Sequence, residues 1–398
     1  MKRRISVLPL AIIAILLFVL NWYVLSGIRI VSSNSFTTPL FWGFISLTTI
    51  ALIYSIIRMR DNGMDLLFKI TTHVFLILFV TEVIFSAFLL LGDLYRLITQ
   101  DSRNIHWVEF TLLVVLLVIL IFIYGIVKGK YAYRVIKHTL FFDDLPSNFD
   151  GFTITQISDV HAGSFKNPTA VQKGINLIKA QNSDLFVFTG DLVNNKAEEI
   201  KPWIDHFKQV KAPYGQFSVL GNHDYGDYIP WKNEAEKSAN LDQLKQYHKE
   251  LGYKLLLDEE VTLHKGDQKI VLAGVENWGI GFGERGDLNK ALAGSETNDF
   301  KILLSHDPSH WEAEVVKHPS KVHLTLSGHT HGMQFGIEAL GIKWSPVKYR
   351  YAHWAGITSK NGRFLNINRG FGFLGFSGRI GIWPEITVIE LKRSPEIN

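Results

Sequence analysis

The chain has no cysteine among its 398 residues. This absence excludes a disulfide framework, a thiolate nucleophile and a zinc site with cysteine ligands. A strong charge of one sign is also missing, because the formal net charge at pH 7 is only +4 and the basic residues form no single stripe. Nucleic-acid-binding proteins depend on clustered Lys and Arg, so we expect no nucleic-acid partner.

Charged residues are rare in the first third of the chain. Residues 1–127 carry most of the apolar excess, whereas residues 140–398 have the composition of a soluble domain. A helix needs about 20 apolar residues to cross a bilayer. Four segments approach or reach this length: Ile5–Leu25, Pro39–Ile57, Leu66–Leu91 and Phe110–Val127. We therefore predict an all-α transmembrane domain of four helices over residues 1–127.

A cleaved signal peptide is the alternative for the first segment, because three basic residues precede it. Its apolar run is longer than the roughly 7–15 residues of a signal-peptide core, and three more apolar segments follow. A retained membrane span is therefore favoured.

Glu82 lies in the middle of the third segment. A carboxylate inside a membrane is costly and is therefore a functional candidate. The alternative is a protonated or hydrogen-bonded contact within the helix block, with His73 or a Ser or Thr as partner.

Basic residues beside the spans predict the orientation of the protein. One side has Lys2, Arg3, Arg4, Arg58, Arg60, Lys69, Lys128, Lys130, Arg134 and Lys137. The other side has only Arg29, Arg96 and Arg103. We expect a multi-pass protein of the cell membrane, with the N-terminus and residues 128–398 in the cytoplasm.

After a predicted juxtamembrane linker over 128–149, the chain repeats one pattern, in which a short apolar run ends in residues able to bind a metal. Such a run is typical of a buried strand. The five runs are Thr153–Ser158, Leu185–Phe188, Phe217–Leu220, Ile302–Leu304 and Val322–Leu326. Helical stretches at Thr169–Ala180 and Glu198–Val210 separate the first three, which predicts an α/β domain. In such folds, sites form beyond the carboxyl ends of the strands.

The candidate metal ligands are two Asp, one Asn and four His residues. They are Asp159, His161, Asp191, Asn222, His306, His329 and His331. Asp159 and His161 are two positions apart, as are His329 and His331, so on an extended backbone each pair projects to one face. Imidazole and carboxylate groups suit Mn, Fe and Zn. Seven ligands are enough for two ions if one carboxylate bridges them.

Each motif alone is a weak signal, since Gly-Asp dipeptides are common in turns and a single His is more often structural than a ligand. Gly221-Asn222-His223-Asp224 and Gly328-His329-Thr330-His331 are more specific. Five motifs in this order, each after a predicted strand, favour a metal centre.

At these residues the sequence closely resembles the calcineurin-like metallophosphoesterase superfamily, over residues 150–392. The family hallmark is the ordered set Asp-x-His, Gly-Asp, Gly-Asn-His-Asp/Glu, a later His, and Gly-His-x-His. The resemblance implies two packed β-sheets flanked by helices, followed here by a tail at 393–398. The C-terminal Asn368-Arg369-Gly370, Arg379 and Pro384-Glu385-Ile386 are similar, more loosely, to bacterial membrane-associated members of the phosphodiesterase type.

The resemblance also implies roles for the site residues. One ion would be held by Asp159, His161, Asp191 and His331, and the other by Asp191, Asn222, His306 and His329, with Asp191 bridging. Mn is the ion we expect, with Fe, Zn or Co as alternatives. A hydroxide bound to ions roughly 3.5–4 Å apart would attack phosphorus in line. His223 would protonate the leaving oxygen or stabilise the transition state, and Asp224 would orient His223.

Some positions depart from relatives within the superfamily. Asn194 stands where purple acid phosphatases have a Tyr, which argues against a tyrosinate–iron centre. The segment also lacks the Asp-Arg-Gly of protein phosphatases, so a phosphoprotein is a poor substrate. Residues 225–250 would lie at the pocket rim, either as a cap or as a neutral surface excursion. Aromatic residues such as Trp354 and Phe373 would pack in the core or, alternatively, contact lipid or an aromatic leaving group.

We therefore predict a membrane-anchored two-metal phosphoesterase that hydrolyses a phosphodiester, pyrophosphate or phosphomonoester bond. Four spans would keep such an enzyme at a bilayer surface, so a lipid or lipid-linked ester is the expected substrate. The alternative is that the spans only localise a hydrolase of a soluble ester. A membrane sensor or scaffold without turnover is disfavoured by the complete ligand set, and a nuclease by the spans and the lack of a basic groove.

Overall fold

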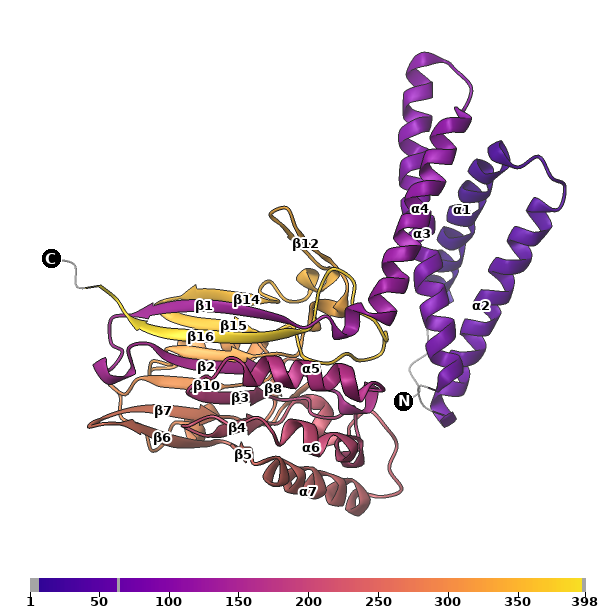
Figure 1. Cartoon of the computed structure of the whole chain (residues 1–398). Coiled ribbons are helices and arrows are strands. Elements are labelled where there is room, and N and C mark those ends of the chain that lie inside the picture. The colour runs from indigo at the N-terminus through magenta and orange to yellow at the C-terminus, as the bar shows by residue number, and fades with distance from the viewer. Residues whose placement is uncertain (1–6, 63–64, 396–398) are drawn as a thin grey trace. The chain divides into compact units, whose positions relative to one another are not determined.

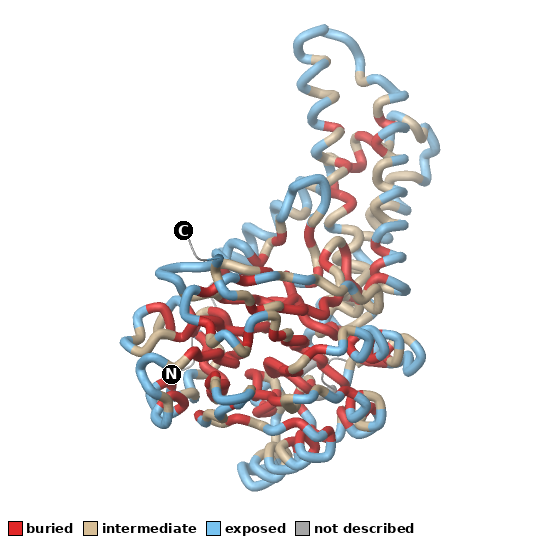
Figure 2. The backbone as a smooth tube through the Cα atoms, turned by 60° about the vertical axis from the view of Figure 1, so that its left-hand side comes forward, coloured by how far each residue is buried: buried red, intermediate tan, exposed pale blue. Residues whose placement is uncertain are grey.

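The computed structural model describes residues 7–62 and 65–395. Lys2, Arg3, Arg4, the predicted span start at Ile5 and the tail end at 396–398 lie outside the described residues. The chain forms two compact units, Met1–Tyr124 and Gly125–Asn398, called here the membrane unit and the catalytic unit. In Figure 2 the buried residues are concentrated in the sheets of the catalytic unit, whereas the long helices are mostly exposed or half-buried.

The membrane unit is built from long helices, which are α1 (Val7–Val31), α2 (Thr37–Asn62), α3 (Leu66–Thr99) and α4 (Ile105–Val127) (Figure 1). Each contains an apolar stretch long enough to cross a membrane. Large apolar side chains such as Leu16, Leu47 and Leu117 are exposed along them. Exposure on this scale suits a lipid environment. The predicted helical domain is confirmed, and the chain is a membrane protein.

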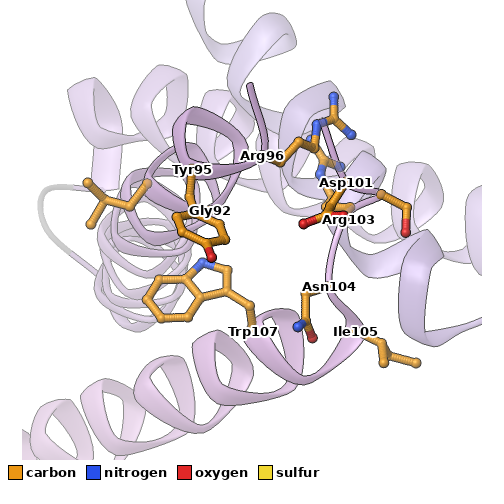
Figure 3. A pocket seen from close by; sticks show the side chains of 10 residues that line it. Gly92, Tyr95, Arg96, Asp101, Arg103, Asn104, Ile105 and Trp107 are labelled. Atoms are coloured by element: carbon orange, nitrogen blue, oxygen red, sulfur yellow. The ribbon is translucent and has the colours of Figure 1, made fainter. Parts of the chain in front are cut away.

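Polar side chains connect the helices near one end of the membrane unit. The Tyr23 hydroxyl donates to Asp93 Oδ2 at 2.8 Å, and Arg103 Nε donates to Asp93 Oδ1 at 2.7 Å. Arg103 Nη1 also donates to Ser26 Oγ at 3.0 Å. A cavity of about 770 Å³ lies at the α3–α4 connection, with Tyr95 and Trp107 on its aromatic side (Figure 3).

Glu82 is buried in the membrane unit and has a side-chain hydrogen bond with Asn21 of α1. His73, which the sequence suggested as its partner, instead places Nδ1 against the backbone carbonyl of Lys69. The structure thus favours the hydrogen-bonded contact within the helix block, with a different partner.

The catalytic unit contains two six-stranded mixed sheets. The first has the order β1 (Arg134–Phe142), β16 (Glu385–Arg393), β2 (Phe152–Ile157), β3 (Leu185–Thr189), β4 (Gln216–Val219) and β5 (Lys254–Leu255). The second has the order β14 (Gly356–Lys360), β15 (Arg363–Ile367), β11 (Leu324–Ser327), β10 (Lys301–Leu304), β7 (Gln268–Gly274) and β6 (Glu259–Lys265). Small paired strands lie outside them: β8 (Trp278–Gly279) with β9 (Gly283–Glu284), and β12 (Ile337–Ala339) with β13 (Ile342–Trp344).

The two sheets pack face to face. Alternate side chains of a strand point to the same face, so Leu185 and Val187 of β3 point together toward the second sheet. They share a core with Ile302 and Leu304 of β10. Phe186 and Phe188 point the other way. Their core includes α5 (Pro168–Lys179), α6 (Ile204–Phe207) and α7 (Glu234–Leu251). The second sheet is covered by α8 (Leu288–Ala291) and α9 (Ser309–Ala313). The predicted fold of two packed sheets flanked by helices is confirmed.

The stretch expected to be a juxtamembrane linker, 128–149, contains β1, and this expectation is wrong. β1 pairs in parallel with β16 along its whole length, from Arg134 opposite Glu385 to Phe142 opposite Arg393. Its basic residues, which suggested a linker, occupy the exposed positions of an edge strand, where charge blocks further strand pairing. The predicted helix Glu198–Val210 also differs. It is a 3₁₀ helix (Ala197–Trp203) with Pro202 inside, followed by α6, because proline interrupts α-helical hydrogen bonding.

Candidate metal centre

The candidate ligands follow five strands whose carboxyl ends lie at one edge of the sandwich. Asp159 and His161 follow β2, Asp191 follows β3, Asn222 follows β4, His306 follows β10, and His329 and His331 follow β11. β2, β3 and β4 are parallel within the first sheet, and β10 and β11 within the second. The structure brings all seven side chains together.

The ligand atoms form two clusters. One contains Asp159, His161 and His331, and the other contains Asp191, His306 and His329, with each set of atoms within 4.8 Å of one another. Asp191 Oδ2 lies 3.5 Å from His161 Nε2 in the first cluster and 3.2 Å from His306 Nε2 in the second. Asn222 Oδ1 joins the second cluster, 2.9 Å from His329 Nδ1. A carboxylate that reaches both clusters has the position that a bridging ligand needs.

The backbone at these residues is not extended, contrary to the sequence analysis. φ is +52° at Asp159, +46° at His161, +60° at Asp191, +70° at His329 and +49° at His331. Left-handed conformations at non-glycine residues cost about 1–3 kcal/mol each and persist only where surrounding contacts enforce them. Backbone bonds do so here, since Asp159 N donates to Gly190 O at 2.9 Å and His161 N to Asp191 O at 3.1 Å.

Burial controls the protonation of the imidazoles. It lowers the pKa of His161 to about 3 and that of His329 to about 4, because a charged ring would lose its hydration. These rings are therefore neutral at pH 7 and keep a lone pair, as metal ligation requires. His306 differs, since burial disfavours its charge but the Asp191 carboxylate outweighs burial and raises its pKa to about 10. Buried carboxylates beside neutral imidazoles are a donor set that divalent transition metals fit.

Neighbouring groups fix which ring nitrogen faces the clusters. His306 Nδ1 lies 2.7 Å from the Thr189 carbonyl oxygen, to which it donates, so Nε2 is the nitrogen that faces Asp191. His329 Nε2 lies 3.3 Å from Asp307 Oδ2, which leaves Nδ1 toward Asn222 and His306. Such partners set the tautomer of a metal ligand. The sequence analysis missed the role of Asp307, although its place directly after His306 was a signal.

Arg379 is a second residue whose role the sequence did not show. Its side chain is fully buried, and Nη2 donates to the carbonyl oxygens of Arg369 at 2.8 Å and Gly372 at 2.6 Å. The same nitrogen lies 3.2 Å from His331 Nδ1. Burial lowers the pKa of Arg379 to about 10, with the Asp159 carboxylate opposing this shift, so the guanidinium stays charged at pH 7. The loop it holds donates to the Asp159 carbonyl through Gly372 N at 2.8 Å.

Asp224 has a different role from the one predicted. Its carboxylate accepts hydrogen bonds from the backbone amides of Asp191, Leu192, Val193 and Gly221, at 2.8 to 3.2 Å. The expectation that Asp224 orients His223 is therefore wrong. His223 Nδ1 instead lies 2.8 Å from the Asn194 carbonyl oxygen, while its backbone amide donates to Asp191 Oδ1 at 2.8 Å. Asp224 positions the Asp191 turn, and Asn194 holds the His223 ring.

The rim of the site is aromatic. The Tyr228 ring lies 4.4 Å from that of His223, and its hydroxyl accepts from Asn222 Nδ2 at 2.8 Å. Phe282 lies edge-on to His329 at 4.5 Å, with the Arg350 guanidinium 4.4 Å from its ring centre. Of the segment 225–250, Tyr228 reaches the rim, whereas α7 packs into the core through Leu244, Tyr247 and Leu251. Trp354 and Phe373 are buried too, so the suggested lipid contact through them is wrong.

Both units of the chain are similar in sequence to known protein families. Residues 3–130 match the family model described as a probable calcineurin-like phosphoesterase, transmembrane domain, and residues 152–333 match calcineurin-like phosphoesterase. The chain is 29% identical over 259 residues to metallophosphoesterase YkuE of Bacillus subtilis, covering 64% of this chain and 84% of that protein. It is 25% identical over 372 residues to a transmembrane protein with metallophosphoesterase domain of Danio rerio, covering 89% and 81%. The solved phosphopantetheinyl hydrolase of Mycobacterium tuberculosis aligns with 55% of this chain and 89% of its own, at 13% identity and a TM-score of 0.33.

The first family model covers the membrane unit and the start of the catalytic unit. The second family model lies within the catalytic unit and contains every candidate ligand. The protein is a metal-dependent phosphoester hydrolase with a transmembrane domain. The chain belongs to the calcineurin-like metallophosphoesterases.

Proposed function

We propose that the protein is a two-metal phosphoesterase that acts at the cytoplasmic face of a membrane on a lipid or lipid-linked phosphoester. The observation that carries the two-metal proposal is the position of Asp191 Oδ2, within 3.5 Å of His161 Nε2 and 3.2 Å of His306 Nε2. Asp159, His161 and His331 would complete the site of one ion. Asn222, His306 and His329 would complete the other, with Mn²⁺ as the expected ion.

Two such ions would supply a nucleophile at neutral pH and polarise a phosphoryl oxygen. The protein's own groups would hold and complete this chemistry. Asp224 holds the Asp191 turn through backbone amides, so the bridging carboxylate is fixed before substrate binds. His223 donates through Nδ1 to Asn194, which leaves Nε2 to exchange a proton with the leaving oxygen. The substrate is expected to be a phosphodiester, pyrophosphate or phosphomonoester.

The proposal of a lipid substrate is supported by the short connection between the last span and the catalytic sheets. α4 ends at Val127, a short 3₁₀ helix spans Gly129–Tyr131, and β1 begins at Arg134. Because β1 pairs with β16 along nine residues, the connection cannot lengthen without breaking the sheet. The catalytic unit is therefore tethered to the last span by a short connection, and lipid headgroups are the most concentrated phosphoesters at a bilayer surface.

Asp191→Ala should abolish hydrolysis of an activated phosphodiester and lower the metal content of the purified protein, because it removes the one ligand that reaches both clusters. Metal per chain is measured by mass spectrometry beside the rate. Asp205→Ala, at an exposed residue of α6, is the matched control and should leave both unchanged. Full activity of Asp191→Ala, or of the wild type after thorough chelation, would contradict the two-metal proposal.

His223→Ala should slow a substrate with an alkoxide leaving group far more than one with nitrophenolate, because only the poor leaving group needs a proton. The loss for the alkoxide should be about 10²–10⁴-fold, the usual contribution of general acid catalysis. Metal content should stay at the wild-type value, and His264→Ala, at an exposed position of β6, serves as the control. Equal losses on both substrates would assign His223 an electrostatic or structural role instead.

Full-length protein in bilayer nanodiscs should hydrolyse a phospholipid presented in the same bilayer faster than a short-chain soluble analogue at matched concentration. The reason is that the short connection keeps the catalytic unit tethered to the bilayer that presents the lipid substrate. Product is quantified by mass spectrometry, with Asp191→Asn as the inactive control. Efficient hydrolysis of soluble phosphoesters together with no cleavage of any lipid phosphoester would rule out the lipid substrate.

The cytoplasmic orientation can be tested directly, since the native chain has no cysteine. Gln100→Cys lies between α3 and α4, and Asn361→Cys lies in the β14–β15 turn; both positions are exposed. An impermeant maleimide should label Gln100→Cys in intact cells and Asn361→Cys only after permeabilisation. The opposite pattern would place the catalytic unit outside the cytoplasm.

A further inference from the structure

One short segment of the catalytic unit, residues 333–349, holds five of the ten exposed large apolar side chains in the described part of that unit. They are Met333, Ile337, Leu340, Ile342 and Tyr349, with exposed fractions of 57%, 50%, 99%, 56% and 78%. Most of this segment is the small hairpin formed by β12 and β13, called here the β12–β13 hairpin. It belongs to neither six-stranded sheet within the described residues and projects from the catalytic unit (Figure 1). Exposed apolar side chains grouped in this way mark an interaction surface.

The register of the hairpin separates an apolar face from a polar one. Ile337 is opposite Trp344 and Ala339 is opposite Ile342, so these side chains share one face. Glu338 is opposite Lys343 on the other face. That face is tied to the domain, since Glu338 accepts from Arg369 Nη2 at 2.5 Å and Lys343 Nζ donates to the Ala355 carbonyl oxygen at 2.5 Å. The apolar face therefore points away from the contacts that hold the hairpin.

The residue at the tip is unexpected for a turn in water. Leu340 has φ of +52°, a left-handed conformation that a tight hairpin turn usually assigns to Asn, Asp or Gly. A bulky apolar residue is strained there, and its side chain is 99% exposed. Neither turn geometry nor packing within the chain accounts for a leucine at this position. Contact with an apolar environment outside the protein would account for the leucine.

The base of the hairpin is connected by backbone hydrogen bonds, through residues 379 and 380, to the last turn of α4. Ile380 N donates to Gln334 O at 2.8 Å, and Gly336 N donates to Ile380 O at 2.9 Å. The adjacent Arg379 N donates at 3.1 Å to the carbonyl oxygen of Gly125, in the last turn of α4. The hairpin is thus connected with the end of α4 through the backbone hydrogen bonds of two adjacent residues, Arg379 and Ile380.

Basic residues accompany the apolar face. Lys348 and Arg350 are exposed and lie just after the hairpin. Such residues attract the anionic lipids of a membrane surface. At about 3.4 Å per residue, Leu340 lies about 10 Å beyond Ile337, comparable to the depth of about 5–10 Å reached by apolar side chains of interfacial segments.

We infer that the β12–β13 hairpin inserts its apolar face and Leu340 into the headgroup–acyl boundary of an anionic bilayer, and so docks the catalytic unit on the membrane. The partner is the bilayer surface itself. This interaction does not depend on which phosphoester the enzyme cleaves. It would connect the bilayer to the metal centre by a short path, since Ile337 is only six residues after His331.

The test uses Leu340→Cys in full-length protein, labelled with an environment-sensitive fluorophore and reconstituted into phosphatidylcholine vesicles with or without phosphatidylglycerol. The emission should shift to the blue, be quenched by lipids with a nitroxide near the headgroup, and be shielded from iodide. Phosphatidylglycerol should increase the lipid quenching and high salt should reduce it. A label on Ile342→Cys, on the same apolar face, should show the same blue shift, nitroxide quenching and iodide shielding. This second position excludes an effect that is confined to the turn.

Asn361→Cys is the matched control, because Asn361 is also an exposed turn residue with positive φ, at +53°, in the β14–β15 hairpin. Its label should remain open to iodide and unaffected by nitroxide lipids. Equal iodide access at positions 340, 342 and 361 in both kinds of vesicle would overturn the inference. Shielding from iodide without quenching by nitroxide lipids would also overturn it and would instead indicate a contact with protein, such as a second copy of the chain. Neither readout depends on turnover, so failure here is distinguishable from failure of the proposed function.

Discussion

The two sheets meet at the metal centre through a contact that leaves no room for a side chain. A Cβ atom added to Gly328 would lie 1.8 Å from Ser158 Oγ and 2.4 Å from Asp159 Oδ2. The same holds within the first sheet, where a Cβ on Gly221 would lie 2.2 Å from Asp191 Oδ1. Only this close approach lets His329 N donate to the Asp159 carboxylate, at 2.9 Å, across the gap between the sheets. The clusters of ligands exist because two separate sheets end against each other.

Polar groups between the sheets reinforce that contact. Gln156 is fully buried in β2; its Nε2 donates to Ser327 O of β11 at 2.9 Å, and its Oε1 accepts from Asn366 Nδ2 of β15 at 2.7 Å. A buried amide that is paired through both its nitrogen and its oxygen favours one arrangement, because shifting the sheets would leave these atoms without partners. The bond network therefore fixes the sheets just behind the site, while Thr189, Asp307 and Asn194 fix the imidazoles within it.

The sequence predicted the fold and which side chains come together at the site, but it did not predict the backbone conformation and hydrogen bonds of these residues. Apolar runs ending in Asp, Asn or His indicated the strand ends, and the seven candidate ligands do converge. The left-handed backbone at Asp159 and His161 was unpredictable, since it depends on bonds to residues 190 and 191, far along the chain. The role of Asp224 depends on amides of another loop, and β1 is a strand only because β16, some 250 residues later, pairs with it.

Arg379 has a consequence for what happens when metal is scarce. Its buried guanidinium lies beside His331, and the Asp159 carboxylate favours its charge. A pocket of acidic groups that loses its cations would ordinarily open through mutual repulsion. Here a permanent positive charge remains inside the pocket, and its donors also hold the loop at Arg369 and Gly372 in place. The arrangement implies that the apoprotein keeps its fold when metal ions are scarce and can bind them again without refolding.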